Sequence, residues 1–304
     1  MSGVFVAGLI NMETTLAVDA FPIPYFPVRY PFFGIQTTVS GVGYNIAKAL
    51  TTLGDSVHFA SIIGKDGNAD LVRKALKDDK IPDDLVLSET EVTAQSVIIY
   101  DPQAKRQIHT DLKDIQKISY PEDKAQPVIE ASDLAAICNV NFSRSLLRIA
   151  KNAGKWIATD VHALSDLEDE YNRDYIAAAQ ILFLSDESLP ATPEEIARQV
   201  MGRFGNEIVV IGLGAKGALL AVRKDDAMER VPAVSTRAVI NTIGAGDALF
   251  SAFLHSFLQT KDPYTAIRTA SIFASYKIGT KGAADGFLTR DELENWVKKV
   301  FGKD

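Results

Sequence analysis

The sequence predicts an α/β fold, a doubly wound and mostly parallel sheet with helices on both faces, together with a small β-strand lid. Three observations support this prediction. Short apolar segments alternate with amphipathic segments along most of the 304 residues, an order typical of a parallel sheet covered by helices. Hydrophobic residues make up 47% of the chain, which is enough for a sizeable core. Two stretches without this alternation predict the lid.

The alternating segments are expected in a regular order. In the first part, strands at FVAGLI and VHFASIIG precede helices near residues 44–53 and 68–79. Further along, the strands LAAIC, WIATD, ILFL and EIVVIGLG alternate with helices near 144–153, 171–179 and 194–203. Thr192 and Glu195 form a capping box around Pro193 at the start of the last of these helices. In such a sheet, ligands gather at the carboxyl ends of the strands.

The two irregular stretches are residues 14–40 and 93–110. The first carries four prolines and many aromatic residues, and the second reads as a hairpin, SVIIY and RQIHT around DPQAK. We expect both to form a small β lid inserted in a single domain that spans residues 1–304. Because an exposed sheet needs cover, the lid is a candidate surface for a homodimer.

The composition excludes several classes of protein. A formal net charge of -7 argues against a dedicated nucleic-acid binder. The single cysteine, Cys138, lies in an apolar run and predicts a buried structural thiol rather than a disulfide. No apolar run reaches transmembrane length and the N-terminus lacks the pattern of a signal peptide, so we expect a cytoplasmic location without membrane partners. The four histidines lack the spacing of metal ligands.

The segment NTIGAGDALFSAFLHSFL, residues 241–258, places a carboxylate at the start of an expected helix. Asp247 has two interpretations: a helix cap, or a general base beside a phosphate that is held by bare backbone. A cap does not require Gly244 and Gly246, whereas a loop whose N–H groups converge on a phosphate does. The glycines therefore favour the base.

Two other glycine-rich segments indicate ligand contacts. GLGAKG, residues 212–217, matches a dinucleotide fingerprint and makes an NAD-dependent dehydrogenase an alternative function. The fingerprint requires a helix after it, but ALLAVRKDD reads as a strand and a turn. SGVGYNIAKALTTLG places Gly41 and Gly43 before a helix with Asn45 in its first turn, either as a cradle for phosphate or hydroxyl groups or as an ordinary helix entry.

Taken together, these motifs identify the chain as similar to the ribokinase-like (PfkB) family of sugar and nucleoside kinases, nearly from end to end. NTIGAGD resembles the DTxGAGD signature, SGVGYNIAKALTTLG the glycine-rich N-terminal signature, GLINME the opening strand and substrate loop, and GLGAKGA the nucleotide-binding turn. The resemblance implies an ATP-dependent kinase that phosphorylates a hydroxymethyl group of a small sugar, sugar derivative or nucleoside, with Mg²⁺ as the metal.

The resemblance also implies site residues. The catalytic set is Asp247 as the base with Gly244, Ala245 and Gly246; the acceptor set is Asn11, Glu13, Gly41, Gly43, Asn45 and Asn141; the ATP set is Ser185, Gly212, Gly214, Lys216, Gly217, Gly246 and Ser271. GVGYN and NVN are similar to segments of pseudouridine kinases, and the aromatic residues of 21–33 offer stacking surfaces, so nucleoside and sugar acceptors both stay open.

Two departures from the family pattern affect metal and cation binding. SDES replaces the N-x-x-E element that helps to place Mg²⁺, which leaves Asp186 and Glu187 as the candidate ligands. Asn241 replaces the first acid of the signature, and a neutral amide attracts a monovalent cation such as K⁺ less strongly. These departures also keep a non-catalytic sugar or nucleotide sensor as a third function to be tested.

Overall fold

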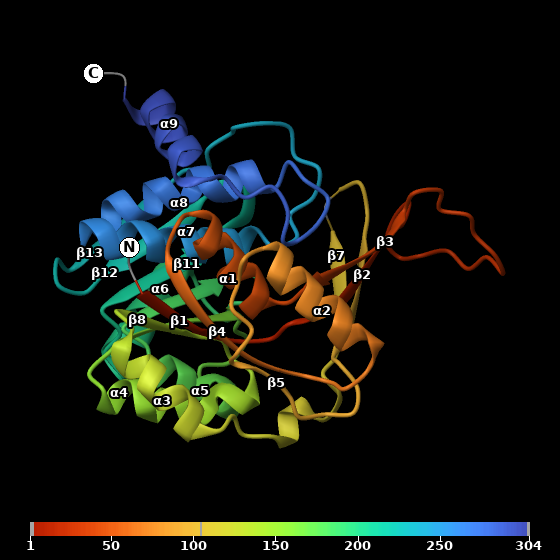
Figure 1. Ribbon diagram of the computed structural model, residues 1–304. Coiled ribbons are helices and arrows are strands. Elements are labelled where there is room, and N and C mark those ends of the chain that lie inside the picture. Colours follow the sequence, from red (N-terminus) through yellow and green to blue (C-terminus); the bar gives the residue numbers. More distant parts are fainter. Residues whose placement is uncertain (1–2, 104, 303–304) are drawn as a thin grey trace.

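The computed structural model of the protein describes residues 3–103 and 105–302 and contains two sheets (Figure 1). The large sheet has nine strands in the order β13-β12-β11-β10-β9-β8-β1-β4-β5. Their bounds are β1 Gly3–Ala7, β4 Ser56–Ile63, β5 Val86–Ser88, β8 Leu134–Ile137, β9 Trp156–Ala163, β10 Ile181–Ser185, β11 Ile208–Gly212, β12 Ala218–Val222 and β13 Ala227–Val231. The strands from β11 to β5 pair in parallel, whereas β12 pairs antiparallel with both β11 and β13.

Helices cover both faces of this sheet, as the sequence predicts (Figure 1). One face carries α1 Val42–Thr52, α2 Gly67–Asp78, α7 Ala245–Thr260, α8 Pro263–Lys277 and α9 Arg290–Phe301. The other carries α3 Glu122–Ala131, α4 Arg144–Asn152, α5 Glu170–Ala178 and α6 Pro193–Phe204. Thr192 and Glu195 form the predicted capping box of α6. The helix α3 was not predicted, because its interior proline, Pro127, hides its helical pattern.

The small sheet, called the lid sheet below, consists of four strands in the order β3-β2-β6-β7. They are β2 Asn11–Ala17, β3 Ile35–Ser40, β6 Gln95–Tyr100 and β7 Arg106–Asp111. The β6–β7 pair is the predicted hairpin, and β2 pairs in parallel with β6. Between β2 and β3 the chain forms a long loop without strands that projects from the body (red in Figure 1).

The first strand is shorter than predicted. β1 ends at Ala7, and Asn11 and Glu13 belong to β2 of the lid sheet, so the expected lid boundary at residue 14 is wrong. The chain leaves the large sheet at Gly8, where a Cβ atom would lie 2.6 Å from the Cys138 sulfur and 2.7 Å from the Cα of Gly43. This close approach of α1 to the end of β1 requires glycine on both sides. It also buries the thiol of Cys138, as predicted.

The strand order reverses at β1, which lies between β4 and β8. In an open parallel sheet, the crevice beyond the carboxyl ends of the strands at such a point is the usual place for ligands. The first turn of α7 lies at this edge, because a Cβ on Gly246 would be 3.8 Å from the carboxylate of Asp160 in β9. None of the helices in the described part of the chain is long and apolar enough to span a membrane.

Candidate active site

The first turn of α7 forms a pocket of backbone donors. Gly244, the N-cap, has a left-handed φ of 75°, and a Cβ there would lie 2.5 Å from the carbonyl oxygen of Ala283. The amides of Ala245 and Ala248 donate to Thr242 and Gly244, whereas those of Gly246 and Asp247 have no hydrogen-bond partner among the described residues. Unpaired amides at the positive end of a 16-residue helix suit an anionic phosphoryl group.

Asp247 is the third residue of α7 and does not cap it. The N-cap position belongs to Gly244 and carries no side-chain cap bond, so the interpretation of Asp247 as a cap is wrong. The carboxylate is buried and accepts a hydrogen bond of 2.6 Å from the amide of Asn45 in α1. Burial raises the pKa of Asp247, and the bond from Asn45 opposes this shift. A buried, oriented carboxylate with raised proton affinity has the properties of a general base.

Polar side chains lead from Asp247 to the inner face of the lid sheet. The hydroxyl of Ser40, at the end of β3, donates to Asn45 over 3.3 Å, and Asn11 of β2 donates to Ser96 of β6 over 2.9 Å. Glu13 is 6% exposed, and burial is the main cause that raises its pKa to about 7. The structure therefore brings Asn11, Glu13 and Asn45 together with Asp247 on one side of the lid.

Two buried atoms on this inner face lack hydrogen-bond partners among the described residues, Oδ1 of Asn11 and Oε1 of Glu13. Unpartnered polar atoms in a protein interior are costly, and both of these are acceptors. A ligand that brings hydroxyl donors would satisfy them. The face therefore fits a hydroxyl-rich molecule.

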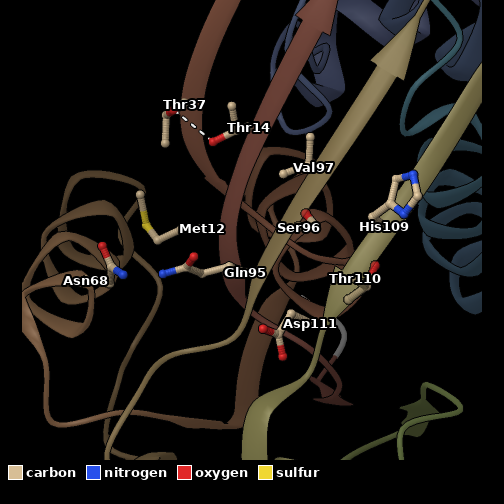
Figure 2. Close-up of a pocket in the computed structure, with 10 residues that line it drawn as sticks. All are labelled: Met12, Thr14, Thr37, Asn68, Gln95, Ser96, Val97, His109, Thr110 and Asp111. Carbon is tan, nitrogen blue, oxygen red and sulfur yellow. Dashed lines mark hydrogen bonds between the residues drawn. The ribbon is translucent and has the colours of Figure 1, made fainter.

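The outer face of the lid sheet carries a separate hollow of about 510 Å³. Figure 2 shows Met12, Thr14, Gln95, Val97 and His109 among the residues that line it. Side chains alternate between the two faces of a strand, so Met12 and Thr14 point away from the face that holds Asn11 and Glu13. This hollow is therefore not the continuation of the site around Asp247.

The residues predicted to contact ATP surround the ends of β10 and β11. Gly212 ends β11, and Gly214 has a positive φ of 56°. Gly217 has a φ of 97°, and a Cβ atom there would lie 2.0 Å from the carbonyl oxygen of Val231. Gly214–Lys216 forms a single 3₁₀ turn before β12. No helix opens here, so the dinucleotide fingerprint lacks its structural context and the dehydrogenase alternative is wrong.

Two members of the predicted ATP set are already used within the protein. The hydroxyl of Ser271 in α8 is buried and donates to Ile267 in its own helix over 2.8 Å. The hydroxyl of Ser185, at the end of β10, accepts from the amide of Glu187 over 3.1 Å. Each oxygen still has a free lone pair for a ligand.

Carboxylates suited to a divalent cation lie at the same edge of the large sheet. Asp186 and Glu187 follow β10 and are exposed, and Asp160 in β9 is 8% exposed beside Gly246. Among the described residues, no group of three or more His, Cys, Asp or Glu side chains converges on one point. The donor set fits Mg²⁺, which commonly takes one or two carboxylates and completes its shell with water and phosphate oxygens. Asp160 was not among the predicted site residues, although it ends the predicted strand WIATD.

Three predicted acceptor residues, Asn141, Gly43 and Gly41, have structural contacts of their own. Asn141 donates to the Gln116 carbonyl over 2.6 Å and accepts from Arg144 over 3.2 Å, so its side chain is not brought to the acceptor face. Gly43 is required because the backbone of Gly8 lies against it. Gly41 is the N-cap of α1, with a φ of 111° that favours glycine.

Two cations at the site were missed from the sequence. Arg106 of β7 donates to the hydroxyl of Thr242 and to Glu187, each over 3.3 Å, and so connects the lid sheet with the loop before α7. Lys277, the last residue of α8, is completely buried and donates to the carbonyl of Ile243. Neither position shows a distinctive pattern in the sequence, because lysine and arginine at such places are usually solvated.

Comparison with known proteins gives consistent results across the chain. Residues 1–290 match the family described as pfkB family carbohydrate kinase. The chain is 25% identical to an acarbose 7(IV)-phosphotransferase of Actinoplanes sp. over 95% of this chain and 96% of the relative. It is also 25% identical to an ATP-dependent ribose-1-phosphate kinase of Halopiger xanaduensis, over 99% of this chain and 100% of the relative.

Solved structures show the same fold. A microbiome-derived acarbose kinase, Mak1, superposes with a TM-score of 0.86 at 24% identity, covering 97% of this chain and 98% of the other. Arabidopsis thaliana ribokinase complexed with ribose and ATP superposes with a TM-score of 0.81 at 20% identity, covering 98% and 99%. At these identities the superpositions establish the architecture of the two sheets.

Proposed function

The chain belongs to the pfkB family of carbohydrate kinases, and we propose that it transfers the γ-phosphoryl group of ATP to a hydroxymethyl group of a small sugar or sugar derivative, with Asp247 as the general base. Membership of the family makes it a phosphotransferase with an alcohol group as acceptor. The observation that carries the finer proposal is the position of Asp247: a buried carboxylate, held by Asn45, in the same first turn of α7 as the unpaired amides.

The chemistry consists mainly of positioning and charge stabilisation. Asp247 accepts the proton of the acceptor hydroxyl while the oxygen of that hydroxyl attacks the γ-phosphorus. The bond between the γ-phosphorus and the bridging oxygen breaks, and ADP leaves with its electrons. The amides of Gly246 and Asp247 stabilise the negative charge of the phosphoryl oxygens. Mg²⁺, when bound, neutralises phosphate charge; Asp160, Asp186 and Glu187 are the residues that would hold it.

The acceptor is expected to be neutral and rich in hydroxyl groups. Glu13 and Asn11 each present an unpartnered acceptor atom on the inner face of the lid sheet, and Ser40 and Ser96 add hydroxyls there. A sugar supplies the donors that these atoms lack. The names of the relatives, which include an acarbose phosphotransferase, are compatible with such an acceptor.

A sugar is favoured over a nucleoside by the positions of the aromatic residues. Tyr25, Phe32 and Phe33 of the loop between β2 and β3 are 87%, 85% and 98% exposed. Stacking on a nucleobase would need such rings over the polar face of the lid. Their exposure instead supports the expectation that the lid region contacts another subunit.

A screen of ADP release across pentoses, hexoses, their phosphates, oligosaccharides and nucleosides tests the proposal. We expect turnover with a neutral sugar and none when the same screen uses Asp247→Asn. If the protein binds ATP but no compound in the screen leads to release of ADP, the result would support the non-catalytic sensor instead. Preference for a nucleoside would refute the choice of acceptor while leaving the kinase chemistry intact.

A further inference from the structure

Lys277 is a buried cation that the proposed chemistry does not yet use. It is 0% exposed at the end of α8, and its ammonium group donates to the carbonyl of Ile243. Ile243 immediately precedes Gly244, the N-cap of the helix whose amides form the phosphoryl site. A completely buried lysine is rare, because the free-energy cost of removing its charge from water must be offset by partners in the interior.

The ammonium lies where two loops meet. The backbone amides of Ile240 and Asn241 donate to Ile278, over 2.8 Å and 3.3 Å. The side-chain amide of Asn241 donates to the carbonyl of Lys281 over 2.6 Å and accepts from the amide of Ile243 over 3.0 Å. The segment 240–244 therefore donates to the segment 278–283, and Lys277, just before the second segment, donates back to Ile243.

This arrangement does not fit a bound monovalent cation. Such ions are held by several carbonyl and carboxylate oxygens that converge on them. Here the ammonium of Lys277 binds the carbonyl of Ile243, where its positive charge repels a second cation, and the carbonyl of Lys281 accepts from Asn241. The side chain at position 241 is an amide whose oxygen is also engaged, so it contributes no negative charge.

The charges around Lys277 explain how it is kept in the interior. Asp247, Asp285 and Glu13 lie near enough to favour the ammonium, whereas Arg237 opposes it. Burial is the main cause that lowers the pKa of Lys277 to about 8, so the group still carries its charge at neutral pH. Its positive charge faces the same loop that would receive the phosphoryl group.

We propose that Lys277 is a positioning residue that acts as a built-in monovalent cation: its ammonium fixes the loop before α7 and supplies the positive charge beneath the phosphoryl site, so this kinase binds ATP and turns over without K⁺. The inference rests on the proposed kinase function. Asn241 completes the arrangement, because an aspartate in its place would face the Lys281 carbonyl with no donor between the two oxygens.

The test compares salts and variants in the full chain. ATP binding with MgCl₂ is measured by calorimetry, and melting by scanning fluorimetry, in KCl and in tetramethylammonium chloride of equal ionic strength. The variants are Lys277→Met, the double variant Asn241→Asp with Lys277→Met, and Lys298→Met as a control that removes an exposed ammonium from α9. ADP is quantified directly by chromatography once an acceptor is found.

For the wild type and Lys298→Met, we expect the same ATP affinity in both salts. Lys277→Met should bind ATP roughly tenfold more weakly, since a charge in a low-dielectric site is lost. The double variant creates a carboxylate that a cation can bridge to the carbonyls, so KCl should raise its melting temperature and restore most of its ATP affinity. This gain is not expected of a lysine with only a packing role.

Three outcomes would overturn the inference: a wild type whose ATP affinity depends on K⁺, a Lys277→Met variant that binds ATP as the wild type does, or a double variant indifferent to K⁺. If Lys277→Met alone fails to fold, the double variant in the two salts decides. A wild type that binds no ATP in either salt would instead refute the proposed function, so the two failures are distinguishable.

Discussion

Replacement of Asp247 by asparagine separates its chemical role from any structural one. Asn is isosteric with Asp and retains an oxygen that can accept the 2.6 Å bond from Asn45, but an amide cannot remove a proton. We expect kcat to fall by roughly 10²-fold to 10⁴-fold, the range for loss of a positioned general base. ATP affinity should stay equal or improve, because a negative charge beside the phosphoryl site is removed.

The same variant should not lose stability. Burial raises the pKa of Asp247 in the folded protein above its unfolded value. A group of this kind contributes stability below the unfolded pKa, and that contribution is lost as pH rises through the folded pKa. At neutral pH the wild type therefore carries the cost of a buried carboxylate that Asn lacks. The melting temperature of Asp247→Asn should equal or exceed that of the wild type at pH 7, and the difference should shrink toward pH 4.

Asp262 provides a matched control, because it is a true helix cap. Its carboxylate accepts from the amides of Tyr264 and Thr265 at the start of α8, over 3.2 Å and 3.0 Å. Asp262→Ala should lower the free energy of unfolding by about 1 kcal/mol and leave kcat unchanged. Both variants are assayed for melting, ATP binding and ADP production. Near-normal turnover in folded Asp247→Asn would refute the proposed mechanism.

Three further predictions concern the lid. Glu13→Gln should raise the KM of the acceptor and leave the KM of ATP unchanged, and unchanged values of both would place Glu13 outside the pocket. Because the pKa of Glu13 is raised to about 7, the variant should also have a higher melting temperature than the wild type at pH 8 but not at pH 4. Arg106→Met should lower kcat by roughly tenfold, since it breaks the contacts to Thr242 and Glu187. Full activity in steady-state assays would show that these contacts have no role in turnover. Amide hydrogen exchange in β2, β3, β6 and β7 should slow when the acceptor binds, whereas equal exchange would argue against a closing lid.

The alternation of strands and helices was predictable because each element buries one apolar face with its own period. β4, β8 and β10 are short apolar runs, and α2, α4 and α5 between them have periodic apolar positions. The GAGD turn was predictable for a different reason. Its glycines satisfy a backbone requirement that few other functions share, and the structure places Gly244 in the left-handed region.

Features that depend on distant segments were not predictable. Glu13 follows an apolar strand in the sequence, yet it lies in the lid sheet, because the contact between Gly8 and Gly43 ends β1 early. Asn141 matches a family pattern, but its side chain is bound by Gln116 and Arg144. Lys277 ends an ordinary helix, and nothing local distinguishes its ammonium from a solvated one. In each case, partners more than 20 residues away or the packing of other elements decide the role.

Besides Arg106, Ile243 connects the lid with the phosphoryl site. From the lid side, Ile98 of β6 packs with Ile243 and Ala283 in a small apolar cluster. From the protein interior, Lys277 binds the carbonyl of Ile243, and the next residue is the N-cap of α7. We expect that a movement of the lid would act on the loop that positions the amides of α7, so an acceptor that closes the lid would also complete the phosphoryl site. Such coupling would limit transfer to water in the absence of acceptor, because closure of the lid would exclude water from the site.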